Sequence, residues 1–241
     1  DSMISAIIQA RMTSSRLPGK VLKPLHGKPM LMRQIERVRN ARRLHNIVVA
    51  TSTDTSDDVL ADRCNDMGVF VARGSLDYVL ARFHYAADTV GADVIVRLTG
   101  DCPLSDPVLI DLLIKKYLAE DFDYVSNTIK PTFPDGLDVE VFSRKALETA
   151  FREARLPSER EHVTPFIKKS STFTCYNLEN DRDLSGHRWT VDEPEDFELI
   201  SRIFSALYPS NPIFGQSEIM TLLDNHPDWS RLNSMIGRDE G

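Results

Sequence analysis

A chain of 241 residues is long enough for one elaborated domain or two small ones, and it can bury a sizeable core without disulfide bonds. With 41% hydrophobic and 27% charged residues, the composition excludes a disordered or fibrous protein. A net charge of −7 argues against broad binding to nucleic acid, and no apolar run approaches the roughly 20 residues of a membrane helix.

The two ends and the cysteines carry further expectations. We expect Asp1 and Ser2 to be a cloning remnant ahead of a native start at Met3. The three cysteines are widely spaced and match neither a zinc pattern nor a disulfide framework. Free thiols of this kind are typical of a reducing compartment, so we expect a cytoplasmic protein.

The first half of the chain alternates apolar runs with helical segments. We predict strands at residues 3–9, 46–51, 68–72, 93–98 and 123–126, and helices at 30–42, 53–64, 75–90 and from 106 onward. Such alternation is typical of an α/β fold with a doubly wound, mostly parallel sheet. Ligands bind beyond the carboxyl ends of the strands in these sheets. The sequence therefore predicts a site on the polar segments 9–20, 51–54, 73–77 and 99–103.

The second half is less regular. We predict short strands at residues 136–142, 172–177 and 187–191, and helices at 143–154, 157–169 and 195–207. Neither an internal repeat nor a low-complexity linker divides the chain. We therefore expect a single domain over residues 3–226, with an excursion near residues 128–180 and a peripheral tail over residues 227–241.

Positive charge is concentrated near the N-terminus. Residues 11–43 hold ten basic side chains and one acidic one, a net charge of +9 that leaves −16 for the rest of the chain. Residues 33–43 are interpreted as a solvated helix face. The loop after the first strand instead combines cations, hydroxyl groups and a glycine, namely Arg11, Arg16, Lys20, Ser14, Ser15 and Gly19. Such a loop suits a polyphosphate, although an ordinary basic loop is the alternative, and its spacing is not that of a Walker A loop.

Two carboxylates follow strands in polar surroundings. Asp101 stands in RLTGDCP just past the fourth strand, and Asp192 stands in RWTVDEPED before a helix. A hard cation such as Mg²⁺ takes one or two carboxylates together with phosphate oxygens and water. An Asp-Glu-Pro-Glu run often only caps a helix, so Asp192 also has this structural interpretation. The helix after Asp101 has its own cap candidates in Ser105 and Asp106.

The stretch SEREHVTPFI, residues 158–167, places Arg160 and His162 close together in the sequence. A cation and an imidazole suit recognition of a carboxylate or phosphate on a second substrate. The alternative interpretation is the start of a surface helix.

These motifs together resemble the sugar cytidylyltransferases, which include CMP-sialate synthetases and the enzymes that activate 3-deoxy-manno-octulosonate. The stretch IIQARMTSSRLPGKVLKPLHGKPM is similar to their opening motif, an apolar strand followed by A-R-x-x-S-x-R-L-P-x-K and G-K-P. RLTGDCPLSDP and VDEPEDFELI resemble their second motif and their late metal-site motif. GSLDYVLARF and SEREHVTPFI resemble more narrowly the branch called spore-coat polysaccharide biosynthesis protein F. The matches span residues 3–200.

The resemblance implies a glycosyltransferase-A-like fold and an Mg²⁺-dependent transfer of CMP from CTP to a sugar acid, with release of pyrophosphate. It implies nucleotide contacts from eight positions in the basic loop and just after the third strand: Gln9, Ala10, Arg11, Ser14, Ser15, Arg16, Lys20 and Arg73. Asp101 and Asp192 would hold Mg²⁺. Arg11, Lys20 and Asp101 would be catalytic, and Arg160 with His162 would bind the carboxylate of the sugar.

Two departures from the family pattern stand out. Gln9 occupies a position where many relatives have proline, and the region 73–82 differs from the sialate and octulosonate branches. Two other functions are considered. A nucleotidyltransferase acting on a sugar 1-phosphate needs the same loop and metal, and a catalytically idle nucleotide-binding module needs only the loop. The resemblance also suggests a homodimer that makes contact through the excursion near residues 128–180.

Overall fold

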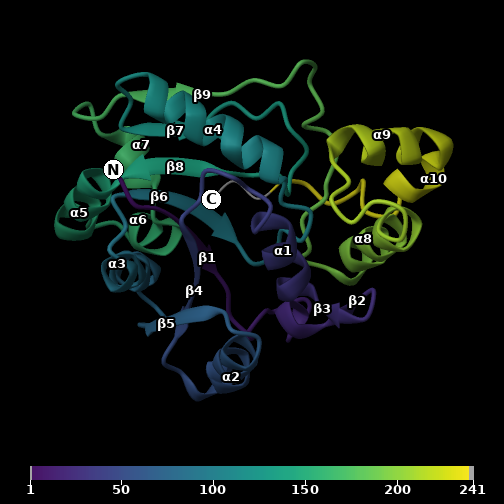
Figure 1. Ribbon diagram of the computed structural model, residues 1–241, viewed down its shortest axis with the longest axis horizontal. Helices are drawn as coiled ribbons and strands as arrows, with labels where there is room; N and C mark the ends of the chain where they lie inside the picture. The colour runs from purple at the N-terminus through teal and green to yellow at the C-terminus, as the bar shows by residue number, and fades with distance from the viewer. Residues whose placement is uncertain (1, 239–241) are drawn as a thin grey trace.

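The structure is a computed structural model that describes residues 2–238. Asp1, in the predicted cloning remnant, and residues 239–241, at the end of the predicted tail, lie outside the described residues. A single sheet of seven strands runs through the molecule in the order β5-β4-β1-β6-β8-β7-β9 (Figure 1). None of the helices in the described part of the chain is both long enough and apolar enough to cross a membrane.

The first half of the chain builds the parallel part of this sheet. β1 (Ile4–Gln9) lies between β4 (Asn46–Ser52) and β6 (Val94–Thr99) and pairs with both in parallel, and β5 (Phe70–Gly74) extends the sheet beyond β4. Because these strands are parallel, their carboxyl ends meet at one edge. The predicted mostly parallel α/β fold is confirmed.

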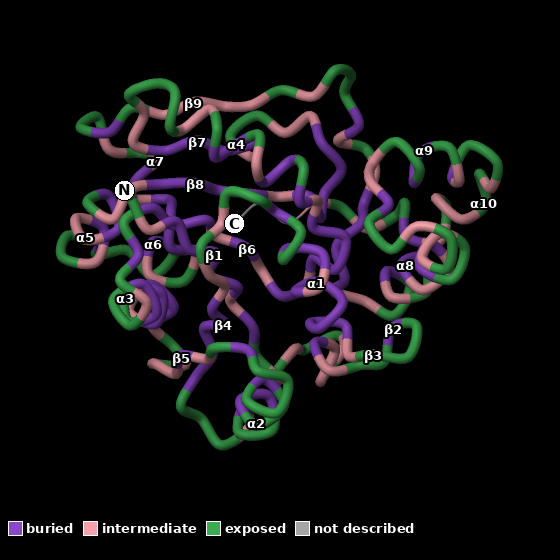
Figure 2. The backbone as a smooth tube through the Cα atoms, viewed as in Figure 1, coloured by how far each residue is buried: buried purple, intermediate pink, exposed green. Residues whose placement is uncertain are grey.

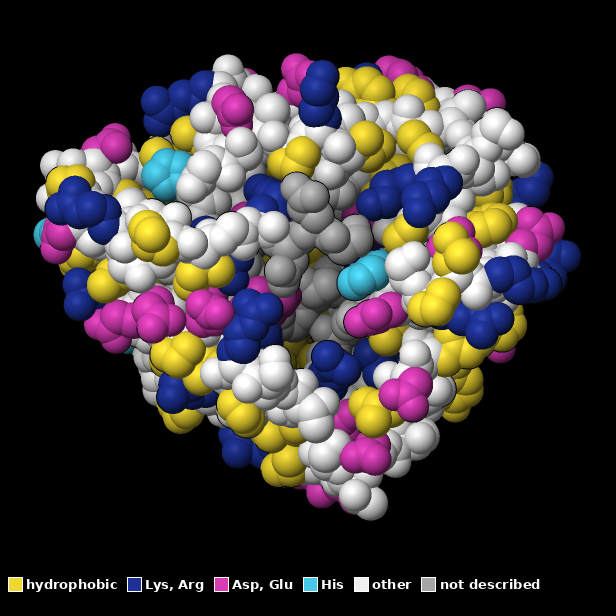
Figure 3. Space-filling model, turned by 180° about the vertical axis from the view of Figure 1, so that it is seen from behind, with side chains coloured by type: hydrophobic (Ala, Val, Ile, Leu, Met, Phe, Trp, Pro, Cys, Tyr) yellow, Lys and Arg dark blue, Asp and Glu magenta, His cyan; other side chains and the backbone are white. Residues whose placement is uncertain are grey.

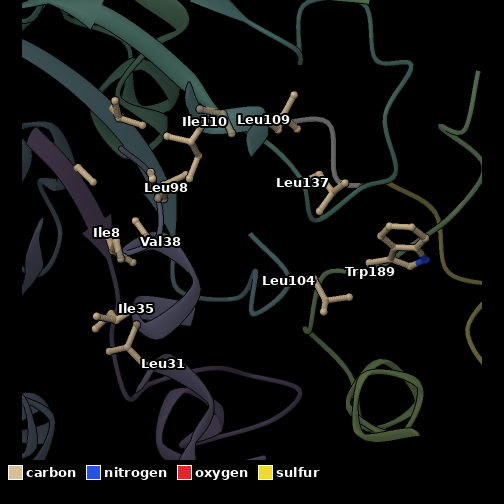
Figure 4. Close-up of a cluster of buried hydrophobic side chains, with 14 of the residues drawn as sticks. Ile8, Leu31, Ile35, Val38, Leu98, Leu104, Leu109, Ile110, Leu137 and Trp189 are labelled. Atoms are coloured by element: carbon tan, nitrogen blue, oxygen red, sulfur yellow. The ribbon is translucent and has the colours of Figure 1, made fainter. Parts of the chain in front are cut away.

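Helices cover both faces because the buried strands are apolar on both sides. Ala6 and Ile8 of β1 point to one face, and Ile7 between them points to the other. The first face packs against α1 (Met30–Val38), α2 (Asp58–Asp66), α4 (Pro107–Ala119) and α8 (Pro194–Leu207). Figure 4 shows side chains of β1, α1, β6 and α4 directed toward one another in this cluster. The second face packs against α3 (Val79–Val90) and α5 (Arg144–Glu153).

The second half adds three short strands with mixed directions. β8 (Glu140–Ser143) is antiparallel to both β6 and β7 (Tyr124–Ser126), and β9 (Cys175–Asn177) is parallel to β7. The buried backbone, purple in Figure 2, includes β8 and β7, so this extension belongs to the core. The antiparallel strand brings the segment before Glu140 to the same edge at which β6 ends.

The strand predicted at residues 187–191 is wrong. This segment makes only one isolated bridge, between Arg188 and Asp135. Gly136 explains the close approach of the two segments, because a Cβ atom there would lie 2.5 Å from the carbonyl carbon of Trp189. Its φ of 113° also lies in a region that favours glycine. The chain therefore crosses at this point instead of forming a ladder.

The single helix predicted over residues 157–169 is also wrong. The structure has two short helices, α6 (Pro157–His162) and α7 (Pro165–Lys169). Val163 separates them with φ 70° and ψ −56°, and the Thr164 amide donates to the His162 carbonyl at 2.8 Å. This is a γ-turn of the rare, strained kind, here at a fully buried β-branched residue. The turn redirects the chain between His162 and Thr164.

The C-terminal segment, which we predicted to be peripheral, makes buried contacts as far as the described residues extend. Beyond α9 (Gln216–Asn225) and α10 (Pro227–Ser230), the side-chain nitrogen Nδ2 of Asn233 donates to the Arg188 carbonyl at 2.9 Å and to Asp196 Oδ1 at 2.8 Å. The Gly237 carbonyl accepts from Arg188 Nη1 at 3.0 Å. These bonds hold the C-terminal segment against Arg188 and Asp196, close to Asp192. They also give the carbonyl groups of Arg188 and Gly237 the partners that backbone groups need away from water.

Short elements follow two of the parallel strands. The 3₁₀ turn η1 (Lys20–Leu22) and the two-residue strands β2 (Pro24–Leu25) and β3 (Lys28–Pro29) lie between β1 and α1, and the 3₁₀ turn η2 (Thr55–Asp57) lies between β4 and α2.

Candidate active site

The candidate site lies where β1 and β6 end side by side. Gln9, the last residue of β1, pairs with Thr99, the last residue of β6. Gly100 follows, and its amide donates to the Gln9 carbonyl at 2.8 Å. A Cβ atom at Gly100 would lie 2.9 Å from the Cβ of Ala10, so only glycine allows this approach. Asp101 is thereby placed next to the beginning of the basic loop.

A buried carboxylate holds the basic loop against the sheet. Asp57, at the end of η2, accepts from the Met12 amide at 2.7 Å and from the Ser52 hydroxyl. Gly19 closes the loop, with φ 72° and a bond from its amide to the Met12 carbonyl at 2.9 Å. The loop is therefore fixed at both ends, so its cations and backbone amides are held in place at the edge of the sheet.

The loop and the two strand ends enclose a first pocket of about 420 Å³. Seven residues that the sequence assigned to the nucleotide line it, as do both residues assigned to Mg²⁺: Gln9, Ala10, Arg11, Ser14, Ser15, Arg16, Lys20, Asp101 and Asp192. Thr13, Thr99, Gly100 and Glu161 lie among them. In Figure 3 Lys and Arg side chains gather near the middle of one face of the molecule, together with Asp and Glu side chains.

Asp192 reaches this pocket from the far end of the chain and is held there by two cations. Lys20 Nζ donates to Asp192 Oδ1 at 2.9 Å and to the Val191 carbonyl at 2.8 Å, and Arg188 Nη2 lies 3.2 Å from Asp192 Oδ2. Burial alone would raise the pKa of Asp192, but Lys20, Arg188 and a hydrogen bond with Asp101 lower it below its usual value. The carboxylate is therefore ionised at neutral pH.

Arg188 is itself fixed by a buried acid. Its Nε donates to Asp196 Oδ1 at 2.9 Å and its Nη2 to Asp196 Oδ2 at 3.0 Å, and the Asp196 side chain is fully buried. Asp196 Oδ2 also accepts from the amides of Asp192 and Glu193 at 3.0 Å each. Asp196, which follows the Asp-Glu-Pro-Glu run, thus organises the start of α8, and Asp192 at the head of the run lines the pocket.

Asp101, unlike Asp192, has no ion pair with a basic side chain among residues 2–238. Thr99 Oγ1 donates to Asp101 Oδ1 at 2.6 Å, and the helix that follows is capped by Asp106, which accepts from Val108 and Leu109. Asp101 therefore has no capping duty. Two neighbouring carboxylates beside a basic loop fit Mg²⁺ when phosphate oxygens complete the coordination. Across residues 2–238 no group of three or more His, Cys, Asp or Glu side chains could hold a metal without such help.

Arg73 does not line the first pocket. Its Nε donates to the Ser52 carbonyl at 2.8 Å, and its Nη2 donates to the Asp54 carbonyl at 3.0 Å and to Asp58 Oδ1 at 2.8 Å. These three bonds occupy the guanidinium at the ends of β4 and β5. The structure therefore gives Arg73 a role in holding the strand ends, away from the residues it was grouped with.

A second pocket of about 410 Å³ adjoins the first, and Thr99 lines both. The remaining lining comes from β6, the antiparallel extension, the γ-turn region and the C-terminal segment: Arg97, Thr128, Ile129, Pro131, Asp138, Glu140, His162, Thr164, Pro165, Lys168 and Arg238. Its walls mix charged groups of both signs with hydroxyl groups. Such walls match a polyhydroxylated anion because they can hold both a charge and several hydroxyls.

The structure separates Arg160 from His162. Residues two apart on a helix face different directions, and accordingly His162 lines the second pocket whereas Arg160 lines a third one. The third pocket, of about 390 Å³, holds Arg11, Arg155 and Arg160 near Asp77. The Arg160 guanidinium lies over the Tyr78 ring, 5.1 Å from its centroid. The pair assigned to one carboxylate therefore serves two neighbouring pockets.

Glu140 is the buried charge of the second pocket. Its side chain is 7% exposed and accepts from Arg97 Nη1 at 2.6 Å, from Thr164 Oγ1 at 2.5 Å and from the Tyr124 hydroxyl. Burial alone would raise its pKa, but Arg97, Lys168 and these hydroxyl donors bring the pKa of Glu140 below its usual value. The carboxylate is ionised and fully bonded.

Asp138, two residues earlier, behaves differently. Burial and the neighbouring carboxylate of Asp135 raise the pKa of Asp138 to about 7, although Arg238 Nη1 lies 3.6 Å away. Asp138 and Glu140 are not among the residues predicted from the sequence, although acids at alternate positions of a half-buried strand indicate that one face of the strand meets something polar. Lys168 is not among them either, and the sequence has no comparable signal for it.

The chain is similar in sequence and in structure to known proteins. A family model described as Cytidylyltransferase matches residues 5–222. The spore coat polysaccharide biosynthesis protein SpsF of Bacillus subtilis is 36% identical over 232 residues, which cover 92% of this chain and 94% of that protein. The 8-amino-3,8-dideoxy-manno-octulosonate cytidylyltransferase of Shewanella frigidimarina is 31% identical over 170 residues, which cover 66% of this chain and 68% of that protein. A solved structure of a cytidylyltransferase from Leptospira borgpetersenii has a TM-score of 0.90 and 33% identity, covering 95% of this chain and 97% of that one.

The chain has the nucleotidyltransferase fold of the cytidylyltransferases, because its structure matches that of the Leptospira protein along nearly the full length of both chains. The family model spans most of the chain, so the chain belongs to the cytidylyltransferase family. The resemblance seen in the opening motif is thereby confirmed.

Proposed function

We propose that this cytidylyltransferase transfers CMP from CTP to a sugar acid for polysaccharide biosynthesis, with the nucleotide in the first pocket and the acceptor in the second. One observation carries the proposal. The basic loop at the end of β1, Asp101 after β6 and Asp192 before α8 come from three distant parts of the chain and line a single pocket. A relative that is 31% identical is named as a cytidylyltransferase for an amino octulosonate, and SpsF is named for polysaccharide biosynthesis, which supports the acceptor class.

The proposed reaction joins the two pockets at Thr99. The anomeric hydroxyl oxygen of a 2-keto sugar acid attacks the α-phosphorus of CTP. A new oxygen–phosphorus bond forms, the bond to the β-phosphate oxygen breaks, pyrophosphate leaves, and the hydroxyl proton passes to water or a nearby base. Such a transfer depends on positioning and on charge stabilisation. Arg11, Arg16 and Lys20 would hold the phosphates, with Arg11 and Lys20 nearest the charge that develops.

Mg²⁺ dependence is part of the proposal. Asp101 and Asp192 would hold the ion, and the ion would supply neutralisation of phosphate charge. The neighbouring carboxyl groups, with Asp192 ionised, support this assignment. Lys20 would then exchange its bond to Asp192 for one to a phosphate oxygen, since one ammonium group can serve either anion.

Acceptor binding would differ from what the sequence alone suggested. His162 and Lys168 line the second pocket with two threonine hydroxyls, whereas Arg160 faces the third pocket, beside Arg11. We therefore place the sugar acid in the second pocket, with its carboxylate toward Thr99, where the two pockets meet, and give Arg160 a place near the nucleotide.

The proposal includes an oligomeric state and a location in the cell. We propose a homodimer that makes contact through residues 128–180, where Ile129 keeps 44% of its surface exposed and β9 forms a sheet edge. We also propose a cytoplasmic location, supported by three cysteines that are all free in the described chain. Light scattering of the purified protein measures the first, and fractionation of cells that express it measures the second.

Pyrophosphate release tests the reaction. The purified chain is assayed with Mg²⁺ or with EDTA, with CTP, UTP, GTP or ATP, against a panel of sugar acids and sugar 1-phosphates. We expect release only with CTP, a sugar acid and Mg²⁺. Release with a sugar 1-phosphate would replace the acceptor and keep the fold. Tight binding of CTP without release on any sugar would favour a nucleotide-binding module.

A further inference from the structure

Gln9 occupies the boundary between the two pockets. It is the last residue of β1 and lines the first pocket, and its register partner Thr99 lines both pockets. Arg97 stands two residues before Thr99 on β6 and lines the second pocket. Alternate residues of a strand share one face, so Arg97 lies diagonally across from Gln9 on the same side of the sheet.

Arg97 fixes the orientation of the Gln9 amide. Arg97 Nη2 donates to Gln9 Oε1 at 3.1 Å, while Arg97 Nη1 donates to Glu140 Oε1 at 2.6 Å. A guanidinium can only donate, so the atom it meets on Gln9 must be the carbonyl oxygen. The amide nitrogen therefore points away from Arg97. It has no protein partner among residues 2–238 and belongs to a side chain that lines the first pocket.

The support behind Arg97 is rigid. Glu140 is 93% buried, and its second oxygen is taken by Thr164 and Tyr124, so it cannot turn away from Arg97. Arg97 is 13% exposed and lies over the Phe83 ring, 5.7 Å from its centroid. The chain from Glu140 through Arg97 to Gln9 thus presents one NH₂ donor at the boundary, and it does so before any ligand arrives.

We infer that Gln9 is a specificity residue that donates a hydrogen bond to the carboxylate of the acceptor, with Arg97 and Glu140 as its positioning residues. The inference rests on the proposed function. An amide NH₂ requires an oxygen acceptor on the ligand. In a 2-keto sugar acid the carboxylate is bonded to the carbon that carries the attacking hydroxyl, so a donor that holds this carboxylate at the boundary also places the hydroxyl there. The phosphates of CTP already have Arg11, Arg16 and Lys20.

Gln9→Glu is the sharpest variant because it keeps the shape of the side chain. The new carboxylate still accepts from Arg97, but it presents an oxygen where the NH₂ stood and repels a substrate carboxylate. We expect the KM for a sugar acid to rise on the order of tenfold or more, with the KM for CTP within about twofold of wild type. The readout is pyrophosphate release with CTP and 3-deoxy-manno-octulosonate or N-acetylneuraminate.

A modified acceptor supplies the reciprocal test. The C1 carboxamide of the same sugar carries its own NH₂, which the wild-type Gln9 amide nitrogen cannot accept but Glu at position 9 can. The ratio of kcat/KM for acid over carboxamide should therefore fall in Gln9→Glu relative to wild type. A merely structural role of Gln9 would lower both values together and leave the ratio unchanged.

Two further variants test whether the effect is specific to Gln9 and whether Arg97 orients it. Gln216→Glu is the matched control, because Gln216 bonds to Asn180 Nδ2 at 3.1 Å and lines neither pocket, and it should leave both KM values unchanged. Arg97→Lys cannot bridge Gln9 and Glu140 with a planar fork. It should raise the KM for the sugar acid and weaken discrimination against the carboxamide, and a melting curve shows whether the variant remains folded.

The outcomes are distinct. Turnover on a sugar acid that is insensitive to Gln9→Glu overturns the inference alone, as does an equal rise in the KM for CTP, which would assign Gln9 to the nucleotide. Turnover only on a sugar 1-phosphate overturns the proposed acceptor, and the inference with it. If no acceptor is turned over, calorimetry of 3-deoxy-manno-octulosonate in the presence of CTP decides, since absent binding to wild type overturns the inference.

Discussion

The two halves of the chain build their pockets in different ways. In the first half, parallel strands end at one edge, so the residues that follow β1 and β6 are brought together by topology alone. In the second half, an antiparallel strand, a strained turn at Val163 and a C-terminal segment each deliver a few residues to the second pocket. The comparison teaches that sheet topology alone can assemble one pocket, whereas the second pocket depends on individual contacts between distant segments.

The largest expected effect concerns Arg188 and Asp196, the buried ion pair of the second half that lies behind Asp192. Asp196→Ala leaves the Arg188 guanidinium without its main partner and removes the acceptor of the Asp192 and Glu193 amides. We expect a loss of about 3–5 kcal/mol in the free energy of unfolding, measured by urea denaturation. Asp228→Ala, on the surface of α10, is the control. A loss below about 1 kcal/mol would mean that Arg188 is held by other contacts.

The next effect tests the edge of the parallel half. Asp101→Asn keeps the size of the side chain and removes the charge proposed to hold Mg²⁺. We expect kcat/KM to fall roughly 10²-fold or more, as when a preorganised electrostatic group is lost. Asp106→Asn is the matched control because asparagine caps a helix as well as aspartate does, so α4 should be undisturbed and the rate unchanged. A near-wild-type rate for Asp101→Asn would remove Asp101 from the metal site.

The second pocket yields a smaller effect. Lys168→Met removes a cation from its wall, and Lys169→Met removes the adjacent cation, which is exposed and lies outside the pocket. If Lys168 binds the acceptor, its variant should raise the KM for the sugar acid about tenfold or more, while the KM for CTP stays constant. Equal behaviour of the two variants would show that Lys168 acts only through the general charge of the surface.

The smallest effect is a pH dependence that belongs only to the second half. The pKa of Asp138 is raised to about 7, so between its usual value of 3.8 and 7 the folded protein holds a proton that the unfolded chain releases. The contribution of Asp138 to stability therefore falls as pH rises through this window. The Tm of Asp138→Asn minus that of wild type should increase from pH 5 to 8.5.

Asp183 provides the comparison for this titration. Bonds from the Ser185 hydroxyl and amide hold the pKa of Asp183 below its usual value, and its side chain is fully exposed. Asp183→Asn should therefore shift the Tm by a constant amount between pH 5 and 8.5. Parallel curves for Asp138→Asn as well would place Asp138 among ordinary surface carboxylates.

Sequence alone predicted the features that depend on local pattern. Buried strands such as β1 and β6 are continuous apolar runs, and Asp106 with Pro107 marks the start of α4, so the order of elements in the first half and its parallel sheet followed directly. The opening motif also indicated the family, and the loop residues from Gln9 to Lys20 do line one pocket. These features are readable because each depends on residues that are close together in the chain.

Tertiary structure decided the features that depend on distant partners. Helical spacing separates the directions of Arg160 and His162, but only the packed fold shows that each side chain lines a pocket of its own. The buried γ-turn at Val163 has no sequence signal, since a β-branched residue is disfavoured there and only surrounding packing holds it. Likewise, the sequence shows Arg97 only as a residue within a strand. The fold adds its two partners, Gln9 on β1 and Glu140 on β8. Local propensity acts along the chain, whereas the identity of a partner across a sheet is determined only when the whole core has packed.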